Sequence, residues 1–465
     1  MAIWQARMVE TSRVKYIGIV EAIEEDIKRR VLKPGDRLPS QRLIANELMV
    51  DLTTVTRAIN EAARRGLVET QRGSGSFIAQ TTFNQYNSLQ LTQGKTLDLS
   101  MNNPPIPVGI NIEQKIADSI IKSGNASHQP NRHLFYQETA GHPDDRAAGS
   151  EWLSEKIPQL DQDKVLISSG AHSALFSILN HLHQQGATHI AAPEFSYPGL
   201  RAMADQLSLV LTGIDMDEDG IKLDCLENKC REQSIDALYL IPNIDNPTTA
   251  TLPLARRQAI ADLAEKYNFI LIEDDPYYPL LEQKITSLYS LAPERCWHIA
   301  TVSKCLSPSM RVAYIVAPDL QHALRLTDDL RISHLMAPPL MTAVVSDWID
   351  TGMIDSVSQE VKKENQRRQR IAKDIFVDHT LFSDDSASHI WMPLRKGFRA
   401  LDLSEQANSL GISIVPSTAF VMSTSQRQAV RISLGAEPDI NTLHTGLSML
   451  ADLFQPGKLR SKSIV

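Results

Sequence analysis

Five short apolar runs recur between residues 165 and 302, separated by stretches long enough to form helices. They cover residues 165–167, 189–192, 237–241, 269–272 and 297–302. Continuous rather than alternating apolar residues indicate strands that are buried on both faces, as in parallel sheets covered by helices. The sequence therefore predicts an α/β domain with a mainly parallel sheet. Because 465 residues exceed what one hydrophobic core normally organises, a further domain is expected.

The residues that follow these runs are candidates for a binding site, because ligands of open α/β sheets bind beyond the carboxyl ends of the strands. The first run leads to Gly170, Ala171 and His172, a small-residue turn where a helix can begin and its free N–H groups can bind a phosphate. The second run precedes Tyr197, which can stack on a heteroaromatic ring. The third precedes Asn246, whose amide can donate to a ring hydroxyl.

The last two runs end in charged residues. Asp274 follows the fourth run, and a carboxylate there can keep a pyridine nitrogen protonated. Lys304 follows the fifth run, and a lysine becomes a nucleophile towards aldehydes when burial or neighbouring charge lowers its pKa. Arg311 is placed to bind a phosphate. Each residue alone is more often structural, but together at successive strand ends they predict a site for pyridoxal 5'-phosphate, which combines an aldehyde, a ring nitrogen and a phosphate.

Over residues 98–455 these motifs resemble the fold-type I aminotransferases. The resemblance implies that Lys304 is the catalytic residue and binds the cofactor as a Schiff base. It implies further cofactor contacts by Asp274 at the pyridine nitrogen, Tyr277 and Asn246 at the ring oxygen, Tyr197 on the ring, and Ala171, Thr301, Ser303 and Arg311 at the phosphate. Tyr136 matches a tyrosine that reaches the phosphate of the neighbouring subunit, which implies a homodimer. Arg431 matches the arginine that binds a substrate carboxylate. At Thr249 the family commonly has glycine, so the turn geometry there is expected to differ.

The N-terminal part shows a different pattern. Apolar residues recur at spacings of three and four from Tyr16 to Val31, which predicts a helix with one buried face. Ser40 is an N-cap candidate for a second, short helix. In the following segment, 52–67, the pattern turns Val55, Ile59 and Ala62 inward and leaves Thr53, Thr54, Thr56 and Arg57 outward. Short strands at 67–70 and 76–78 around the turn 72–75 complete a winged helix-turn-helix.

The motifs PGDRLPSQRLIANEL, TTVTRAINEAARRGLV and GSGSFI, in this order within residues 12–80, resemble the bacterial GntR family. The resemblance implies that the third helix enters the major groove of double-stranded DNA. It places Arg42 and Arg72 near phosphates, and Thr53, Thr54 and Arg57 near bases or the DNA backbone. Leu52 stands where many members have arginine, so base specificity is not carried over. A helical module that serves only oligomerisation is the alternative.

Charge, cysteine usage and hydropathy support this organisation. Residues 1–80 contain 13 Lys and Arg against 10 Asp and Glu, whereas the rest contains 34 against 45, so the N-terminal module is the basic part, as DNA binding requires. Residues 81–97 are rich in Gln, Thr and Asn and are predicted to be an exposed linker. The four cysteines lack zinc-site spacing, so no metal site is expected. Without an apolar leader or a run of about 18 apolar residues, the chain is predicted to be cytoplasmic, with no membrane partner.

The order of the two parts, a GntR-like module followed by an aminotransferase-like domain, resembles the MocR subgroup of GntR regulators. Two functions are compatible with it. The first is a transcription regulator whose aminotransferase-like domain senses pyridoxal phosphate, an amine or an amino acid. The second is a working aminotransferase with an accessory DNA-binding module. Both need every residue of the predicted pocket, and the attached module favours the regulator.

Overall fold

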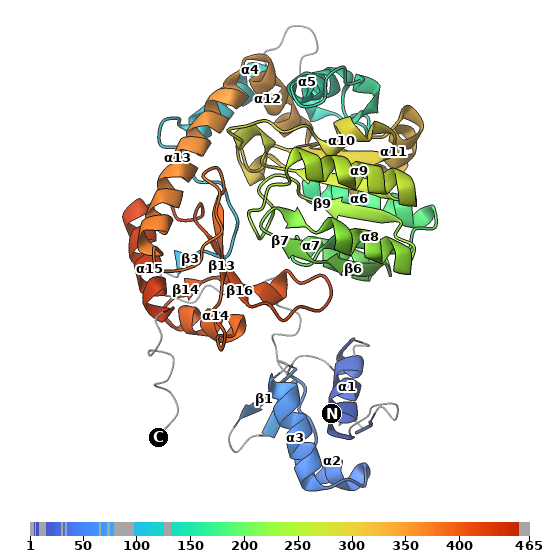
Figure 1. Ribbon diagram of the computed structural model, residues 1–465, viewed down its shortest axis with the longest axis vertical. Coiled ribbons are helices and arrows are strands. Elements are labelled where there is room, and N and C mark those ends of the chain that lie inside the picture. Colours follow the sequence, from blue (N-terminus) through green and yellow to red (C-terminus); the bar gives the residue numbers. More distant parts are fainter. Residues whose placement is uncertain are drawn as a thin grey trace. The chain divides into compact units, whose positions relative to one another are not determined.

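The computed structural model describes residues 4, 6–8, 15–28, 31–32, 35–64, 67–71, 75–78, 97–124 and 132–454. The chain divides into two compact units, Met1–Gly94 and Lys95–Val465 (Figure 1). The predicted linker lies outside the described residues except for its last residue, Leu97, which belongs to the larger unit and pairs with Ile412. The wing residue Arg72 also lies outside them.

The smaller unit is a winged helix-turn-helix, as predicted. Ser40 caps the second helix, because its Oγ accepts a hydrogen bond from Leu43 N at 3.3 Å. Val31, expected on the buried face of the first helix, lies beyond the end of that helix and is 62% exposed. The elements are α1 (Lys15–Lys28), α2 (Gln41–Glu47), α3 (Leu52–Arg64) and the antiparallel strands β1 (Val68–Gln71) and β2 (Gly75–Ile78).

The core of the smaller unit includes residues that precede the predicted module. Trp4 is buried among the apolar side chains of α1 and α3, and its Nε1 donates to Asp26 Oδ2 at 2.8 Å. Arg7 forms an ion pair with the same carboxylate, with a distance of 2.6 Å between Nη2 and Oδ1. The N-terminal residues Trp4 and Arg7 therefore stabilise α1 through Asp26, a role that their sequence did not indicate.

The larger unit is built on a seven-stranded sheet in the order β4-β12-β11-β10-β9-β5-β6. All strands are parallel except β12, which confirms the prediction of a mainly parallel sheet. The five predicted runs form β4, β5, β9, β10 and β11. The strands are β4 (Val165–Ser168), β5 (His189–Pro193), β6 (Val210–Ile214), β9 (Ala237–Leu240), β10 (Ile270–Asp275), β11 (Cys296–Thr301) and β12 (Ala313–Val316), with a small hairpin of β7 (Met216–Asp217) and β8 (Gly220–Ile221) beside them.

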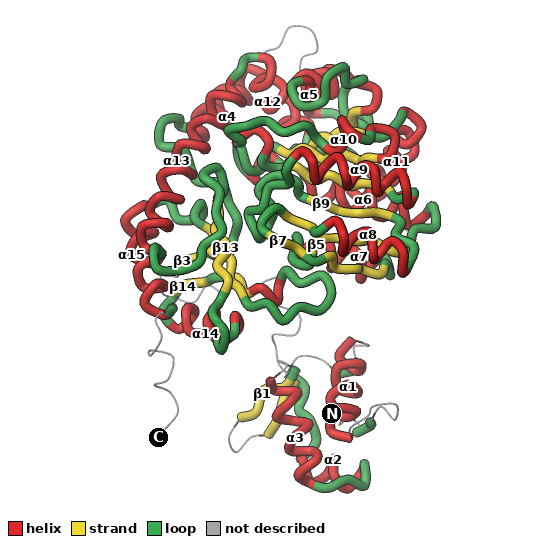
Figure 2. Tube along the Cα trace, viewed as in Figure 1, coloured by secondary structure: helices red, strands yellow, loops and turns green. Residues whose placement is uncertain are grey.

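Both faces of this sheet are covered by helices (Figure 2). Successive strand residues belong to opposite cores: Val165 and Ile167 pack on one face, and Leu166 packs on the other. One face carries α5 (Pro143–Ser154), α8 (Leu223–Glu232), α9 (Leu254–Tyr267), α10 (Leu288–Leu291), α12 (Pro339–Asp350) and the start of α13 (Met353–Ile375). The other carries α6 (Ala171–Gln184), α7 (Pro198–Gln206) and α11 (Leu320–His334). The helix α4 (Ile112–Gly124) packs against α12.

The rest of the larger unit has its own core. The long helix α13 extends from the seven-stranded sheet to a three-stranded antiparallel sheet (Figure 1). Leu99, at the start of the unit, is buried in this second core. The elements are β3 (Leu97–Asp98), β13 (His389–Pro393), α14 (Ala400–Ser409), β14 (Ile412–Ser413), β15 (Val415–Pro416), β16 (Ala429–Ser433) and α15 (Ile440–Leu453). No helix of the described part of the chain is long and apolar enough to cross a bilayer.

Candidate functional site

Lys304 lies in the turn that follows β11, close to the start of the larger unit. Its Nζ donates a hydrogen bond to the carbonyl oxygen of Asn102. Burial and the positive charge of Arg431 lower the pKa of Lys304 to about 8, against the opposing effect of the Asp274 carboxylate. An amine with this pKa is partly neutral near pH 7, which is the state that attacks an aldehyde.

Asp274 is the penultimate residue of β10, and it is buried. Tyr239 OH donates to its Oδ2 at 2.8 Å, whereas Oδ1 has no hydrogen-bond partner among the described residues. Burial raises the pKa of Asp274 to about 6, although the bond from Tyr239 opposes this shift. A buried carboxylate oxygen without a donor is costly, and the protonated nitrogen of a pyridine ring would supply one. The predicted role of Asp274 fits this environment.

Asn246, Tyr277 and Arg431 lie around the same region. Arg431 Nη1 donates to Asn246 Oδ1 at 2.8 Å, and its Nη2 donates to the carbonyl oxygen of Ser100. Tyr277 OH accepts a hydrogen bond from Asn102 Nδ2 at 2.8 Å. Arg431 is buried, which lowers its pKa to about 10, and its Nε has no partner in the described structure. The guanidinium therefore retains a free donor for a carboxylate.

The residues predicted to bind the phosphate include those at the N-terminus of α6. Gly170 has a φ of 90°, and no side chain caps the helix, so its first N–H groups remain available. A Cβ atom at residue 170 would lie 2.8 Å from the Arg311 guanidinium, which shows how closely the two residues approach. Arg311 Nη2 donates to Ser169 O at 2.8 Å. Thr301 Oγ1 lies 3.2 Å from Ser303 Oγ, so two hydroxyl groups stand together at the end of β11.

Tyr197 and His172 contact each other, with 2.9 Å between Tyr197 OH and His172 Nδ1. Burial and the charge of Arg311 lower the pKa of His172, so this imidazole is neutral at pH 7. Thr249 has a φ of 63°, in the left-handed region that favours glycine, which explains why glycine is common there. The expected departure in turn geometry is therefore not seen, because Thr249 adopts the left-handed backbone conformation that glycine would adopt.

Tyr136 does not join the site of its own chain. Its side chain is 84% exposed, and no hydrogen bond, ion pair or ring contact connects it to another described residue. Its neighbours Leu134 and Phe135 are also exposed. This leaves Tyr136 available to a second subunit.

In the smaller unit, the described residues that were predicted to bind DNA belong to α2 and α3. Arg42 in α2 is exposed, and so are Thr53 and Arg57 in α3, whereas Thr54 is half-buried. Thr56 was expected to project outward and be available to DNA, and this is wrong. Its Oγ1 donates to Gln41 Oε1 at 2.8 Å and so connects α3 to α2. The predicted burial of Val55, Ile59 and Ala62 is confirmed.

The sequence missed Ser100, Asn102 and Tyr239. Ser100 and Asn102 contribute backbone carbonyl oxygens, which carry no sequence signal, and Asn102 also donates from its side chain to Tyr277. Tyr239 stands in the middle of an apolar strand, where a tyrosine is usually part of the core. No group of His, Cys, Asp or Glu in the described ranges is arranged to bind a metal, and the four cysteines, all of which are described, form no disulfide.

Comparison with known proteins identifies both units. Residues 94–450 match the family of aminotransferases class I and II, and residues 15–78 match the gntR family of bacterial regulatory proteins. The HTH-type transcriptional regulator YdeF of Bacillus subtilis is 27% identical over 468 aligned residues, covering 97% of this chain and 96% of YdeF. The pyridoxine biosynthesis regulator PdxR of Corynebacterium glutamicum is 24% identical over 377 residues, covering 77% of this chain and 78% of PdxR.

Among solved structures, the kynurenine aminotransferase of Pyrococcus horikoshii superposes with a TM-score of 0.71 at 21% identity, covering 78% of this chain and 91% of that enzyme. This similarity confirms the predicted fold-type I architecture of the larger unit. The chain therefore belongs to the aminotransferase class I and II family, whose cofactor is pyridoxal 5'-phosphate, and its GntR-type domain makes it a transcription regulator of the MocR architecture.

Proposed function

We propose that this regulator binds operator DNA as a homodimer and changes its DNA affinity when pyridoxal phosphate, an amine or an amino acid binds at the site around Lys304. The proposal rests on the segment 97–102, where the chain enters the larger unit from the linker. This segment provides the carbonyl oxygens of Asn102 and Ser100 to Lys304 and Arg431. A ligand that uses either cation competes directly with the chain that leads to the DNA-binding unit.

Different residues of the site contact different parts of the cofactor. Pyridoxal phosphate, when bound, supplies an aldehyde that amines capture reversibly and a ring that accepts electrons. Asp274 holds a proton at the pyridine nitrogen, Tyr277 and Asn246 orient the ring oxygen, and Tyr197 covers the ring. Gly170, Ala171, His172, Thr301, Ser303 and Arg311 hold the phosphate.

The effector contacts follow from the same geometry. Lys304 would hold the cofactor through its Nζ or release it to an incoming amine, so the hydrogen bond that Nζ donates to Asn102 O would depend on what occupies the site. An amino acid also has a carboxylate, which Arg431 can bind. The Nε of Arg431 is a free donor, and its two Nη atoms donate to Asn246 and Ser100 in this structure. Charge-assisted bonds to a carboxylate are stronger than bonds to a neutral carbonyl, so this ligand would displace Ser100 from Arg431.

The DNA side of the proposal uses the exposed side chains of α2 and α3. Arg42 and, on the wing, Arg72 contact phosphates, while Thr53, Thr54 and Arg57 lie towards the major groove. A homodimer would present two such modules to two half-sites of an operator. Because its target is the chromosome, we infer that the protein works in the cytoplasm.

An active aminotransferase remains the second candidate, because Lys304, Asp274 and Arg431 are all present with the environment that transamination needs. Electrophoretic mobility shift of the full chain on its own promoter, with and without an amino acid, separates the two.

We expect the ligand to change the DNA affinity of the wild type, whereas Lys304→Ala keeps basal DNA binding and loses the response. Removal of residues 1–80 should abolish the shift. Rapid amino transfer to 2-oxo acids, with no ligand effect on DNA affinity, would instead identify an enzyme.

A further inference from the structure

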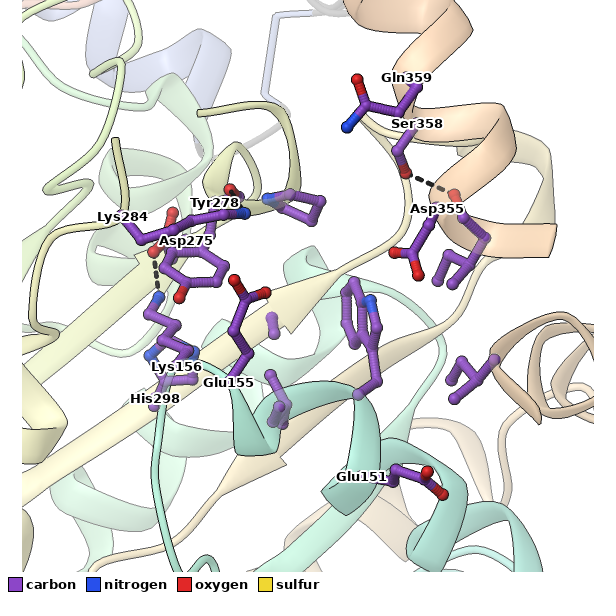
Figure 3. Close-up of a pocket in the computed structure, with 16 residues that line it drawn as sticks. Glu151, Glu155, Lys156, Asp275, Tyr278, Lys284, His298, Asp355, Ser358 and Gln359 are labelled. Atoms are coloured by element: carbon purple, nitrogen blue, oxygen red, sulfur yellow. Dashed lines mark hydrogen bonds and ion pairs between the residues drawn. The ribbon is translucent and has the colours of Figure 1, made fainter. Parts of the chain in front are cut away.

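A separate cavity of about 410 Å³ is lined by Asp275 of β10, the residue that follows Asp274 (Figure 3). Side chains alternate along a strand, so Asp274 and Asp275 point to opposite faces. Asp274 contacts Tyr239, whereas Asp275 contacts Lys156 and lines the cavity. The volume falls within the range of about 300–1,000 Å³ that is typical of small-molecule sites. None of the residues assigned to the cofactor or the effector lines this cavity.

The rim of the cavity is acidic. Glu151 and Glu155 come from α5 and the residue after it, and Asp355 comes from the first turn of α13, on another wall (Figure 3). No ion pair or hydrogen bond connects these three carboxylates to a side chain of the described structure. Trp152 and Ile354 provide apolar surface between them.

The two lysines of the cavity are already engaged. Lys156 is buried and forms an ion pair with Asp275. Lys284 Nζ donates to Tyr278 O at 3.0 Å and lies 4.3 Å from the centre of the Tyr278 ring. Four carboxylates therefore face two ammonium groups, and the cavity has an excess of negative charge.

The inner end provides two buried acceptor atoms without partners. Asp275 Oδ2 accepts from Lys156 and from Asn243 Nδ2 at 2.6 Å, but Asp275 Oδ1 has no hydrogen-bond partner in the described structure. His298 Nε2 also has none, although the residue is fully buried and lines the cavity.

The hydrogen-bond network determines that His298 Nε2 is an acceptor. Glu273 accepts from the backbone N–H groups of Leu288 and Tyr289, each at 3.1 Å, as an ionised carboxylate does. Burial lowers the pKa of His298, so the imidazole is neutral, and its Nδ1, at 2.9 Å from Glu273 Oε2, is the N–H donor. The inner end thus presents two acceptors without partners beside the Lys156–Asp275 pair, and the rim presents three more carboxylates.

We propose that this cavity binds an aliphatic diamine or polyamine. One ammonium group lies among Glu151, Glu155 and Asp355, the methylene chain packs on Trp152 and Ile354, and a second ammonium group donates to Asp275 Oδ1 and His298 Nε2. Ammonium groups have several N–H donors and no acceptor, which matches the two unpartnered acceptors of the inner end. Because Asp275 directly follows Asp274 on β10, occupation of the cavity is expected to alter the environment of the cofactor ring.

The test is isothermal titration calorimetry on the full-length, cofactor-loaded protein with 1,4-diaminobutane and spermidine. The informative variant is Glu151→Gln/Asp355→Asn, because both side chains are on the rim and their replacement leaves the buried Lys156–Asp275 pair intact. Glu405→Gln/Asp374→Asn is the matched control, since it removes two exposed carboxylates that do not line the cavity. We expect the rim variant to bind both amines at least tenfold more weakly than the wild type, and the control to bind within twofold of it.

A tertiary diamine, N,N,N',N'-tetramethyl-1,4-diaminobutane, distinguishes this cavity from the site at Lys304, because it cannot react with the cofactor aldehyde. We expect it to bind with the same dependence on Glu151 and Asp355, and we expect n-butylamine to bind at least tenfold more weakly than 1,4-diaminobutane. Equal affinities in the rim variant and the control would refute the proposal. So would binding of glutarate in place of diamines, or binding of only those amines that also consume the visible absorbance of the cofactor. None of these outcomes affects the proposed response of DNA binding.

Discussion

At the scale of single residues, the reactivity of the site depends on the protonation of Lys304. Burial and Arg431 lower its pKa to about 8, so about a tenth of the amine is neutral at pH 7 and about a hundredth at pH 6. We expect the rate of cofactor uptake by the apoprotein to rise with pH from 6 to 8 and to level off above about 9. Stopped-flow absorbance measures this rate, and borohydride reduction followed by peptide mass spectrometry should find the cofactor on Lys304. A rate that does not change with pH, or an adduct on another lysine, would contradict the assignment.

The negative charge of Asp274 is expected to determine the affinity for the cofactor. Replacement by asparagine keeps an acceptor for Tyr239 but removes the negative charge that holds a proton on the pyridine nitrogen. We expect Asp274→Asn to lower the affinity for pyridoxal phosphate at least tenfold in equilibrium dialysis, whereas Asp262→Asn, on the exposed side of α9, should have no effect.

The same variant separates cofactor binding from folding. The pKa of Asp274 is raised in the folded apoprotein, to about 6, so its contribution lowers stability as the pH rises from about 4 to 6 and stays at that lower level above pH 6. Asparagine removes that cost. The thermal midpoint of apo Asp274→Asn at pH 7 should therefore be equal to or above that of the wild type, and a large decrease would mean that the loss of affinity reflects misfolding.

Residues that act through their side chains at strand ends were predictable, and those that act through the backbone were not. Asn246 and Arg431 were named from their motifs, and the structure brings them within 2.8 Å of each other. Ser100 and Asn102 were not named, because carbonyl oxygens exist at every position of the chain and the bond from the Asn102 side chain to Tyr277 joins residues far apart in the sequence. Their importance depends on where β3 pairs with β14, which is a long-range contact that local patterns do not contain.

At the scale of elements, the continuous apolar runs predicted strands well because each of those strands is buried on both faces. β6 lacked this signal because it is the edge strand and its first residues are exposed or half-buried. β12 follows directly on the loop of Arg311, and it was not predicted as a separate strand. In the second core, β3, β14 and β15 have two residues each, too few to show any period. The relation of the short strands to the site was therefore visible only in the structure.

The exposed side chains of α3 can be tested for contact with DNA. Arg57 is exposed on the same helix as Thr53, whereas Lys15 is exposed at the start of α1. We expect Arg57→Ala to weaken operator binding at least fivefold and Lys15→Ala to change it less than twofold. A contact to a phosphate would also reduce the slope of log affinity against log salt by about 0.9, whereas a contact to a base would leave the slope unchanged and relax sequence preference. Equal affinities for the two variants would mean that α3 does not contact DNA as proposed.

At the scale of the whole molecule, the site is incomplete within one chain if Tyr136 contributes to the phosphate shell. The side chain is exposed and has no partner among the described residues, and Leu134 and Phe135 expose apolar surface next to it. Exposed apolar side chains grouped on a surface indicate an interface. A twofold axis near this surface would bring each Tyr136 to the other subunit, because the two halves of such an interface are identical.

Mixed dimers test this arrangement. In a dimer of one Tyr136→Ala subunit and one Lys304→Ala subunit, a tyrosine that crosses the interface leaves one complete site: the Lys304 of the first subunit together with the Tyr136 of the second. If Tyr136 served its own chain, neither site would be complete. We expect each homodimer to bind pyridoxal phosphate at least tenfold more weakly than the wild type, and the mixed dimer, purified through two different affinity tags, to bind one equivalent with wild-type affinity.

Tyr136→Phe keeps the ring and removes only the hydroxyl group that reaches the phosphate, so a loss of affinity in that variant would identify the hydroxyl as the contact. A mixed dimer as weak as its parents would instead show that Tyr136 has no role in the neighbouring site.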